Sequence, residues 1–431
     1  MHCILVDAYS SGRFLPAALA KHGATCTHVQ SSATLPDFYL RTFPKDAFAP
    51  QDALVHDGDL DALTEKLLAR APDFIVAGAE SGVDLVDQLA PRLGLPSHAA
   101  ATARVRRDKY EMAAAVRAHG LRAPDTLRTG SFDTALAWAK GHGRWPLVVK
   151  PIDSAGTDNV HFARNTVELC TAFDQIMHSA NLMGVQNRAA VLQEYLAGTE
   201  YFANTVSVHG RHHVAEIWRY HKRLGPHGAA VYDYEEPVAP DDPAARTLRS
   251  YLLPVLDALG VRHGPAHSEI MLTDRGPVLI ESGARIAGSI LPDVVDRCFG
   301  TDHVELTAKA LCDPAGFERW AGQPYQLRTG LRYISLIAPR AGRLTSFAGF
   351  DRLRELKSFA ALNLGVEVGD TVQPTVDSAT SPGTCYLLHD DPAQIESDYR
   401  TLREWEQTGE LYRLTSADSP IDSTELPVAR R

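Results

Sequence analysis

Two short apolar runs, each carrying one glutamate, constrain this chain more than any other feature. The runs "HSEIML" (267–272) and "PVLIES" (277–282) flank "TDRG", which predicts a hairpin. If the turn centres on Arg275, Glu269 lies directly opposite Glu281, and facing carboxylates repel each other. A pair of glutamates pointing into water is the plain alternative, but apolar neighbours on both strands disfavour it. The pattern therefore favours a bound Mg²⁺, a hard cation that prefers oxygen ligands.

Charge and cysteine usage narrow the class of protein. The chain has 431 residues and a net charge of -10, which argues against nucleic acid or an anionic membrane as a partner. The six cysteines are scattered without a CxxC pair, as expected for free thiols in a reducing cytoplasm. No apolar run approaches membrane-spanning length, and the start "MHCILVDAYS" reads as a strand rather than a signal peptide. We expect a cytoplasmic protein, with a homodimer as the commonest assembly.

The pattern of predicted helices and strands changes along the chain. Residues 1–95 alternate short apolar runs with helical patterns, which predicts an α/β domain with a parallel sheet. Only Gly12 follows the first strand, so the dinucleotide fingerprint is missing. Residues 96–330 mix helices with strands in tight turns, an α+β pattern with a central part at about 121–200. A second α+β domain is expected over 331–415, followed by a polar tail at 416–431.

Lys109 lies on the apolar side of a predicted helix. The spacing predicts a helix over 105–119, in which Val105, Met112 and Val116 form one stripe with Lys109 in its middle. A lysine in such a place either extends its ammonium group to water or meets an anion.

Lys150 ends the apolar strand "PLVVK" and precedes a loop of small and polar residues, "PIDSAGTDNV". The order differs from a Walker loop, in which the lysine follows the glycines. Ser154, Gly156 and Thr157 at the tip of this loop can still offer backbone N–H groups to phosphate oxygens.

Taken in order, these features resemble one known superfamily. A lysine in a helix, a lysine before a small-residue hairpin, "QEYLAGTEY" and then "SEI…LIESGAR" are similar to the ATP-grasp carboxylate–amine ligases, over about residues 100–330. The resemblance implies an ATP-grasp fold for 96–330, with 121–200 as its lid, a Rossmann-like domain before it and an α+β domain after it. It also implies ATP and Mg²⁺ as cofactors, with Mn²⁺ as a substitute.

The resemblance assigns roles to individual residues. Lys109, Lys150 and the loop with Ser154, Gly156 and Thr157 would contact the phosphates, and Glu269 and Glu281 would hold the metal. The adenine hinge would comprise Gln193, Glu194, Tyr195 and Leu196, with Glu200 near the ribose. Arg285 would be the catalytic residue, at the acyl phosphate.

Gly283 separates this chain from much of the superfamily. "ESGAR" carries Gly283 where an asparagine often completes the metal shell, and this form resembles the L-amino-acid ligases, dipeptide synthases of the bacilysin and dapdiamide type. That likeness implies that Glu80, which follows the strand "DFIVAG", holds a substrate ammonium group. Glu80 at the N-terminus of the next helix is an equally weighted alternative. The substrate residues would be Glu80, Arg285, Gly288 and His227.

The predicted function is ATP-dependent joining of the carboxylate of one amino acid to the amine of another through an acyl phosphate. Two alternatives stay open. One is another ATP-grasp chemistry, such as carboxylation or a carboxylate–amine ligation of primary metabolism. The other is a nucleotide-binding regulator without turnover, against which the retained Arg285 and both metal-binding acids argue.

Overall fold

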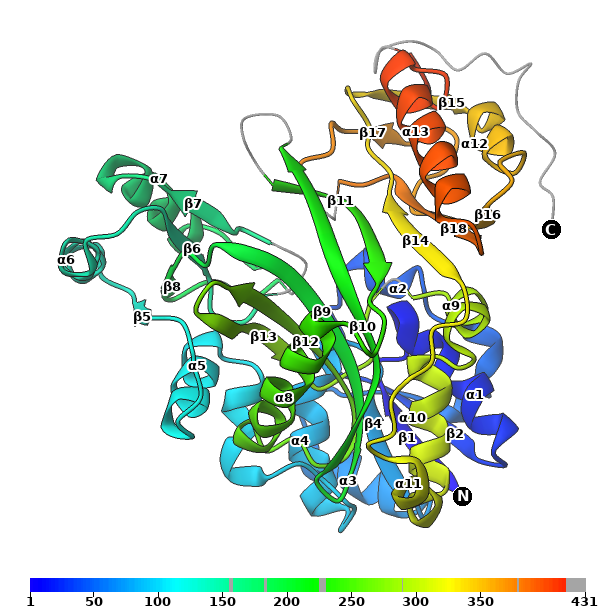
Figure 1. Cartoon of the computed structure of the whole chain (residues 1–431). Coiled ribbons are helices and arrows are strands. Elements are labelled where there is room, and N and C mark those ends of the chain that lie inside the picture. The colour runs from blue at the N-terminus through cyan, green and yellow to red at the C-terminus, as the bar shows by residue number, and fades with distance from the viewer. Residues whose placement is uncertain (155–157, 182–183, 225–229, 289, 378–379, 416–431) are drawn as a thin grey trace. The chain divides into compact units, whose positions relative to one another are not determined.

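The chain forms two compact units (Figure 1). The computed structural model describes residues 1–154, 158–181, 184–224, 230–288, 290–377 and 380–415. One unit comprises Met1–Ile217 and Val238–Gln326, and the other comprises Trp218–Pro237 and the chain from Leu327 onward. Within the described ranges, no helix combines the length and the apolar character needed to cross a membrane.

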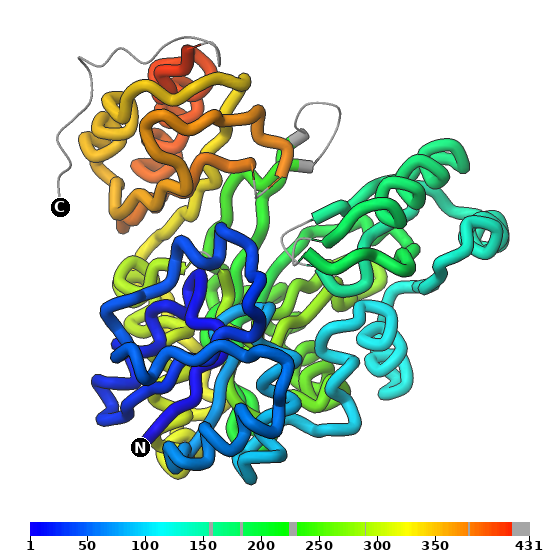
Figure 2. The backbone as a smooth tube through the Cα atoms, turned by 180° about the vertical axis from the view of Figure 1, so that it is seen from behind, coloured from blue at the N-terminus to red at the C-terminus, as the bar shows by residue number. Residues whose placement is uncertain are grey.

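The first unit begins with the predicted parallel sheet, which is confirmed. Its strand order is β3-β2-β1-β4, and all three pairings are parallel. Figure 2 shows this part of the backbone in blue, gathered in one body. The elements are β1 (His2–Val6), η1 (Ser10–Phe14), α1 (Leu15–Lys21), β2 (Thr25–Gln30), α2 (Asp37–Leu40), η2 (Lys45–Ala47), η3 (Pro50–Asp52), β3 (Ala53–Val55), α3 (Leu60–Leu68), β4 (Phe74–Ala77), η4 (Glu80–Gly82) and α4 (Val83–Arg92).

A four-stranded antiparallel sheet with the order β5-β8-β6-β7 follows, with two helices packed on its apolar side chains. It is reached through η5 (Ala100–Arg106) and α5 (Lys109–Ala118). Its elements are β5 (Thr126–Thr129), α6 (Phe132–His142), β6 (Leu147–Pro151), β7 (His161–Ala163), α7 (Thr166–Met177) and β8 (Ala190–Glu194).

The rest of the first unit contains the acid-bearing strands. The strand order is β13-β12-β9-β10, and β12 pairs antiparallel with both β9 and β13. The elements are β9 (Gly198–Val208), β10 (Arg211–Leu224, of which residues 211–217 belong to this unit), α8 (Pro243–Ala258), β12 (Gly264–Thr273), β13 (Gly276–Gly283), α9 (Pro292–Phe299), α10 (His303–Cys312) and α11 (Pro314–Trp320).

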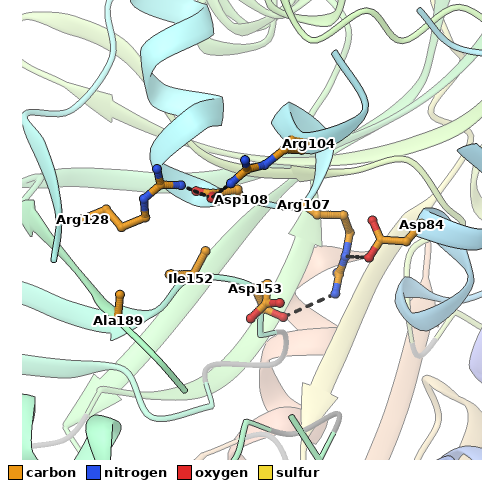
Figure 3. A pocket seen from close by; sticks show the side chains of 8 residues that line it. All are labelled: Asp84, Arg104, Arg107, Asp108, Arg128, Ile152, Asp153 and Ala189. Atoms are coloured by element: carbon orange, nitrogen blue, oxygen red, sulfur yellow. Dashed lines mark hydrogen bonds and ion pairs between the residues drawn. The ribbon is translucent and has the colours of Figure 1, made fainter. Parts of the chain in front are cut away.

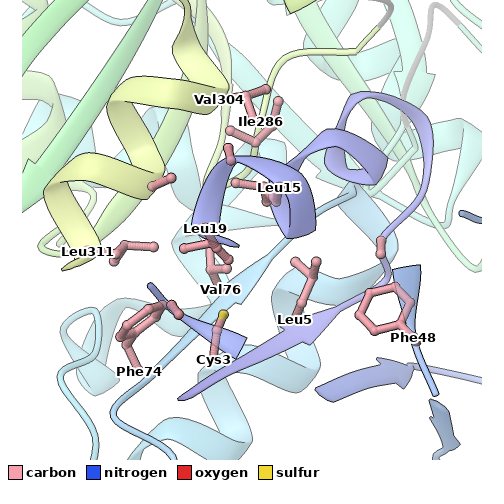
Figure 4. Close-up of a cluster of buried hydrophobic side chains, with 14 residues drawn as sticks. Cys3, Leu5, Leu15, Leu19, Phe48, Phe74, Val76, Ile286, Val304 and Leu311 are labelled. Carbon is pink, nitrogen blue, oxygen red and sulfur yellow. The ribbon is translucent and has the colours of Figure 1, made fainter. Parts of the chain in front are cut away.

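One apolar core fixes the end of the β13 segment to the N-terminal sheet. Leu5 and Val76 from β1 and β4 pack with Leu15 of α1, and this core also takes in Val304 of α10 (Figure 4). Ile286, which follows Arg285, is 2% exposed and belongs to the same core. Burying a side chain of this size contributes roughly 1.5–3 kcal/mol, so the backbone beside Arg285 is held firmly.

The second unit is built on a separate core. The remaining part of β10 leads the strand order β11-β14-β18-β16, and β17-β15-β19 form a small second sheet. Arg403 is almost fully buried and joins Asp233 to Glu406, at 2.6 Å from each. The elements are β11 (Ala230–Pro237), β14 (Gly330–Ser335), β15 (Gly342–Ser346), α12 (Ala348–Leu353), β16 (Phe359–Leu364), β17 (Thr371–Val372), β18 (Gly383–His389), α13 (Pro392–Thr408) and β19 (Arg413–Thr415).

A buried arginine fixes the segment that leads into α5. Arg106 is 1% exposed, and its guanidinium lies 2.8 Å from Asp87 of α4. It also donates to the carbonyl of Leu259, 3.1 Å away, at the end of α8. Arg106 therefore anchors the start of α5, including Lys109, to two other helices, α4 and α8.

Replacement of Arg106 by methionine should destabilise the protein strongly. Asp87 would remain buried without its counter-ion, and breaking a buried pair from one side typically costs about 3–5 kcal/mol. Urea denaturation measures this loss. Arg104→Met is the matched control, because the Arg104 side chain is 76% exposed and its ion pair with Asp108 is long, at 3.6 Å. Loss of such a surface pair should change the free energy of unfolding by under about 1 kcal/mol. Equal losses in both variants would contradict the anchoring role of Arg106.

Candidate active site

The two glutamates of the hairpin face each other, as the sequence predicts. Glu269 of β12 and Glu281 of β13 are direct partners across the antiparallel pair. The predicted turn centre at Arg275 is wrong, because Thr273 pairs with Gly276 and only two residues form the turn. A bulge at Ile280 adds one residue to β13, and this extra residue restores the opposition of the two acids.

Lys109 connects these acids to the loop after Lys150. Its Nζ atom lies 3.0 Å from Glu281 Oε2 and donates to the carbonyl of Ser154, 2.6 Å away. The predicted helix start was wrong: α5 begins at Lys109, because the Asp108 side chain caps the N–H groups of Tyr110 and Glu111. Val105 belongs to the preceding η5, so Lys109 stands at a helix N-terminus rather than within an apolar stripe.

Lys150 lies at the end of β6, as predicted, and only 4% of it is exposed. Burial is the main cause that lowers its pKa to about 8, and the positive charge of Lys109 acts in the same direction. The carboxylates of Glu281, Glu269 and Glu200 oppose this shift. The structure thus brings Lys109, Lys150 and three predicted acids into one electrostatic group.

The predicted adenine hinge runs from the end of β8 toward β9. Gln193 and Glu194 end β8, Tyr195 is exposed and Leu196 is buried. The Glu194 carboxylate accepts from the backbone N–H of Asp125 and from Arg275, so its side chain fixes the strand end. The backbone of 195–197 forms the short connection between the strands.

Glu80 lies between two arginines. It follows β4 and is 9% exposed, with Oε1 at 2.5 Å from Arg107 Nη1 and Oε2 at 2.8 Å from Arg285 Nε. Burial opposes ionisation of Glu80, but Arg107 and Arg285 outweigh it and lower the pKa to about 2. Glu80 also begins η4, which leads directly into α4 at Val83, so the alternative role at a helix N-terminus is compatible with these ion pairs. Glu80 therefore links the N-terminal sheet to the segment that follows β13.

The absence of a side chain at Gly283 makes this contact possible. A Cβ atom at this position would lie 2.5 Å from Glu80 Oε2 and 3.3 Å from Arg285 Nε. Any residue other than glycine would displace the Glu80 carboxylate. The departure from the frequent asparagine therefore has a steric reason, since position 283 is the space that Glu80 uses.

Arg107 is the important residue that sequence reasoning missed. It precedes Asp108 and Lys109 in "RRDKYEM", but nothing in that run distinguishes Arg107 from Arg106, which is buried elsewhere. Gly288, predicted at the substrate, is exposed in a turn near Ser10. Three predicted residues, Gly156, Thr157 and His227, lie outside the described residues.

Comparisons with known proteins identify the family of the chain. The family model "ATP-grasp domain" matches residues 143–293, and "L-amino acid ligase C-terminal domain 2" matches residues 334–404. Dapdiamide A synthase of Enterobacter agglomerans is 30% identical over 96% of this chain and 97% of its own length. Alanine–anticapsin ligase of Bacillus subtilis is 23% identical over 60% of this chain and 58% of that protein.

Solved structures show the same fold. The crystal structure of an L-amino acid ligase from Bacillus licheniformis superposes with a TM-score of 0.72 at 18% identity, covering 96% of this chain and 98% of that one. A carboxyaminoimidazole ribonucleotide synthase from Aspergillus clavatus, complexed with ATP, gives a TM-score of 0.69 at 12% identity, covering 94% and 98%. These likenesses and the site define an ATP-grasp carboxylate–amine ligase. The chain belongs to the L-amino acid ligase family of these ATP-dependent enzymes.

Replacement of Gly283 by alanine should lower kcat/KM by about 10- to 100-fold, because Glu80 must move away from Arg285 and misplaced groups are costly in catalysis. Steady-state kinetics measures the loss, and calorimetry should find the affinity for ATP unchanged. Gly141→Ala is the control, since a Cβ atom there meets nothing within 4 Å. Full activity in the Gly283→Ala variant would contradict the steric role.

Proposed function

We propose that this chain joins the carboxylate of one amino acid to the amine of another, with ATP converted to ADP and phosphate. The proposal rests on two sets of charged groups. The first comprises the opposed acids Glu269 and Glu281 with Lys109 and Lys150. The second is the Glu80–Arg285 pair, in which Arg285 follows Glu281 by four residues. The first set suits a metal–triphosphate complex. The second offers both charges that a zwitterionic substrate requires.

The donor set at the hairpin fits Mg²⁺. Glu269 and Glu281 supply hard oxygen ligands, and two carboxylates on directly paired positions repel each other unless cations balance them. Lys109 partly provides that balance, at 3.0 Å from Glu281. When bound, Mg²⁺ would screen the triphosphate charge and orient its oxygens. Mn²⁺ has compatible ligand preferences and is the expected substitute.

The chain's own residues act mainly by position and charge. Lys109 and Lys150 hold phosphate oxygens, which allows the substrate carboxylate to approach the γ-phosphorus. A carboxylate oxygen of the substrate forms a new bond to the γ-phosphorus while the bond between this phosphorus and the oxygen of ADP breaks, giving an acyl phosphate. The backbone from Gln193 to Leu196 orients the adenine, Glu200 lies near the ribose, and Ser154 lies beside the phosphates.

Amide formation completes the reaction. The second amino acid attacks the acyl carbon with its neutral amine, the C–O bond to phosphate breaks, and the amine proton leaves to solvent or phosphate. The Arg285 guanidinium stabilises the oxyanion that develops. Glu80 binds the ammonium group of an amino-acid substrate. The partners are thus small zwitterionic molecules.

Phosphate release across pairs of amino acids tests this function. The wild-type protein with MgATP should release phosphate only when a suitable pair is present, and mass spectrometry should detect the corresponding dipeptide. Stimulation by bicarbonate instead would indicate a carboxylation. Absence of release with every pair would reject amino-acid ligation.

Replacement of Glu281 by glutamine should lower turnover by at least about 1,000-fold, because a neutral amide is a poor ligand for Mg²⁺ at a site that stabilises transferring phosphate. Phosphate release at saturating MgATP measures the effect, and a Mn²⁺ titration by electron paramagnetic resonance in the presence of ATP should show weakened binding. Glu111→Gln, a change of a half-buried glutamate paired with Arg128, is the control. Normal turnover in Glu281→Gln would exclude metal ligation by this residue.

A further inference from the structure

Glu80 is fully matched by cations in the ligand-free structure, which conflicts with binding an ammonium group. Oε1 of Glu80 pairs with Arg107 and Oε2 pairs with Arg285, so guanidinium groups occupy both carboxylate oxygens. A substrate ammonium group would be repelled by both guanidinium groups and would find neither carboxylate oxygen open to it. One of the arginines must therefore move before an ammonium group can take its place.

Space around Glu80 leads to the same conclusion. The cavity that Glu80, Arg107, Lys109 and Gly283 line has a volume of about 10 Å³. This volume is at the lower limit for a single water molecule. An amino acid cannot reach Glu80 while Arg107 remains in place.

Arg107 has a second set of acceptors within reach, on its side away from Glu80. Its Nε atom lies 3.6 Å from Asp84 Oδ2 and makes no hydrogen bond within the described ranges of the chain. Its Nη2 atom donates to the carbonyl of Asp153, 3.3 Å away. Figure 3 shows Arg107 between these two aspartates. A shift of about 1 Å would turn the Asp84 contact into a charge-assisted hydrogen bond.

A larger cavity allows this movement. Asp84, Arg107 and Asp153 line a space of about 440 Å³, together with Arg104 and other residues (Figure 3). Arg285, by contrast, is held by Glu80 and by the carbonyl of Ile286, and the proposed chemistry requires it beside the acyl phosphate. Arg107 is thus the cation that can leave.

We propose that Arg107 is a positioning residue that occupies Glu80 Oε1 in the free enzyme and retracts toward Asp84 and Asp153 when a substrate ammonium group replaces it. The proposal rests on the proposed function, because it takes an amino acid as the substrate. It also couples the two halves of the site, since Asp153 directly precedes Ser154, whose carbonyl binds Lys109. Arrival of the amino acid would therefore adjust the backbone at Asp153 and Ser154.

The test uses two substitutions with opposite expected signs. Calorimetry on the full-length protein with a non-hydrolysable ATP analogue measures the Kd of the amino acid that stimulates phosphate release. Arg107→Met should lower this Kd by about three- to tenfold, because a competing cation disappears and the binding-competent fraction rises. Asp84→Ala should raise it by a similar factor, because the retracted arginine loses both its acceptor and its counter-charge. Asp84 is 62% exposed on its side chain, so this variant should fold.

Controls separate positioning from simple structural support. Arg107→Lys keeps the cation and should bind nearly as wild type, and Arg104→Met, which lines the same cavity, should not change the Kd. The deamino analogue of the same acid should bind all variants equally. If Arg107→Met weakens amino-acid binding, or if Asp84→Ala leaves it unchanged, the proposal for Arg107 is wrong while the ligase function stands. If no amino acid stimulates phosphate release from the wild type, both are rejected.

Discussion

The repulsion between Glu269 and Glu281 is the constraint around which the site of this enzyme is organised. Two acids held on paired strand positions require cations, and the structure supplies Lys109 at 3.0 Å from one of them and the buried Lys150 nearby. The same requirement explains why the loop after Lys150 lies at Lys109, through the carbonyl of Ser154.

The Glu80 carboxylate likewise requires cations beside it. Glu80 is buried and would resist ionisation without Arg107 and Arg285, which together keep its pKa at about 2. The contact depends on the empty space at Gly283, and the apolar core around Ile286 holds the neighbouring backbone. The glycine at position 283 is thus a structural requirement of the Glu80–Arg285 contact.

The motif positions of the ATP-binding region could be predicted from local patterns. Strand-ending Lys150, the facing acids and the parallel N-terminal sheet follow from apolar periodicity and turn residues, which act over short stretches of chain. The predictions that were wrong involved features with little local signal. The helix start at Lys109 depends on capping by Asp108, and the register of the hairpin depends on a bulge at Ile280.

The sequence by itself determined the order of the ATP-binding motifs and the identity of the family, because each motif is contiguous and carries its own spacing. Only the tertiary structure decided which charged residues meet. Glu80 and Arg285 are 205 positions apart, and Arg107 looks like its neighbour Arg106 in the sequence, yet one arginine holds Glu80 and the other holds Asp87. Ion pairs of this kind form through packing of distant segments, and no local pattern encodes them.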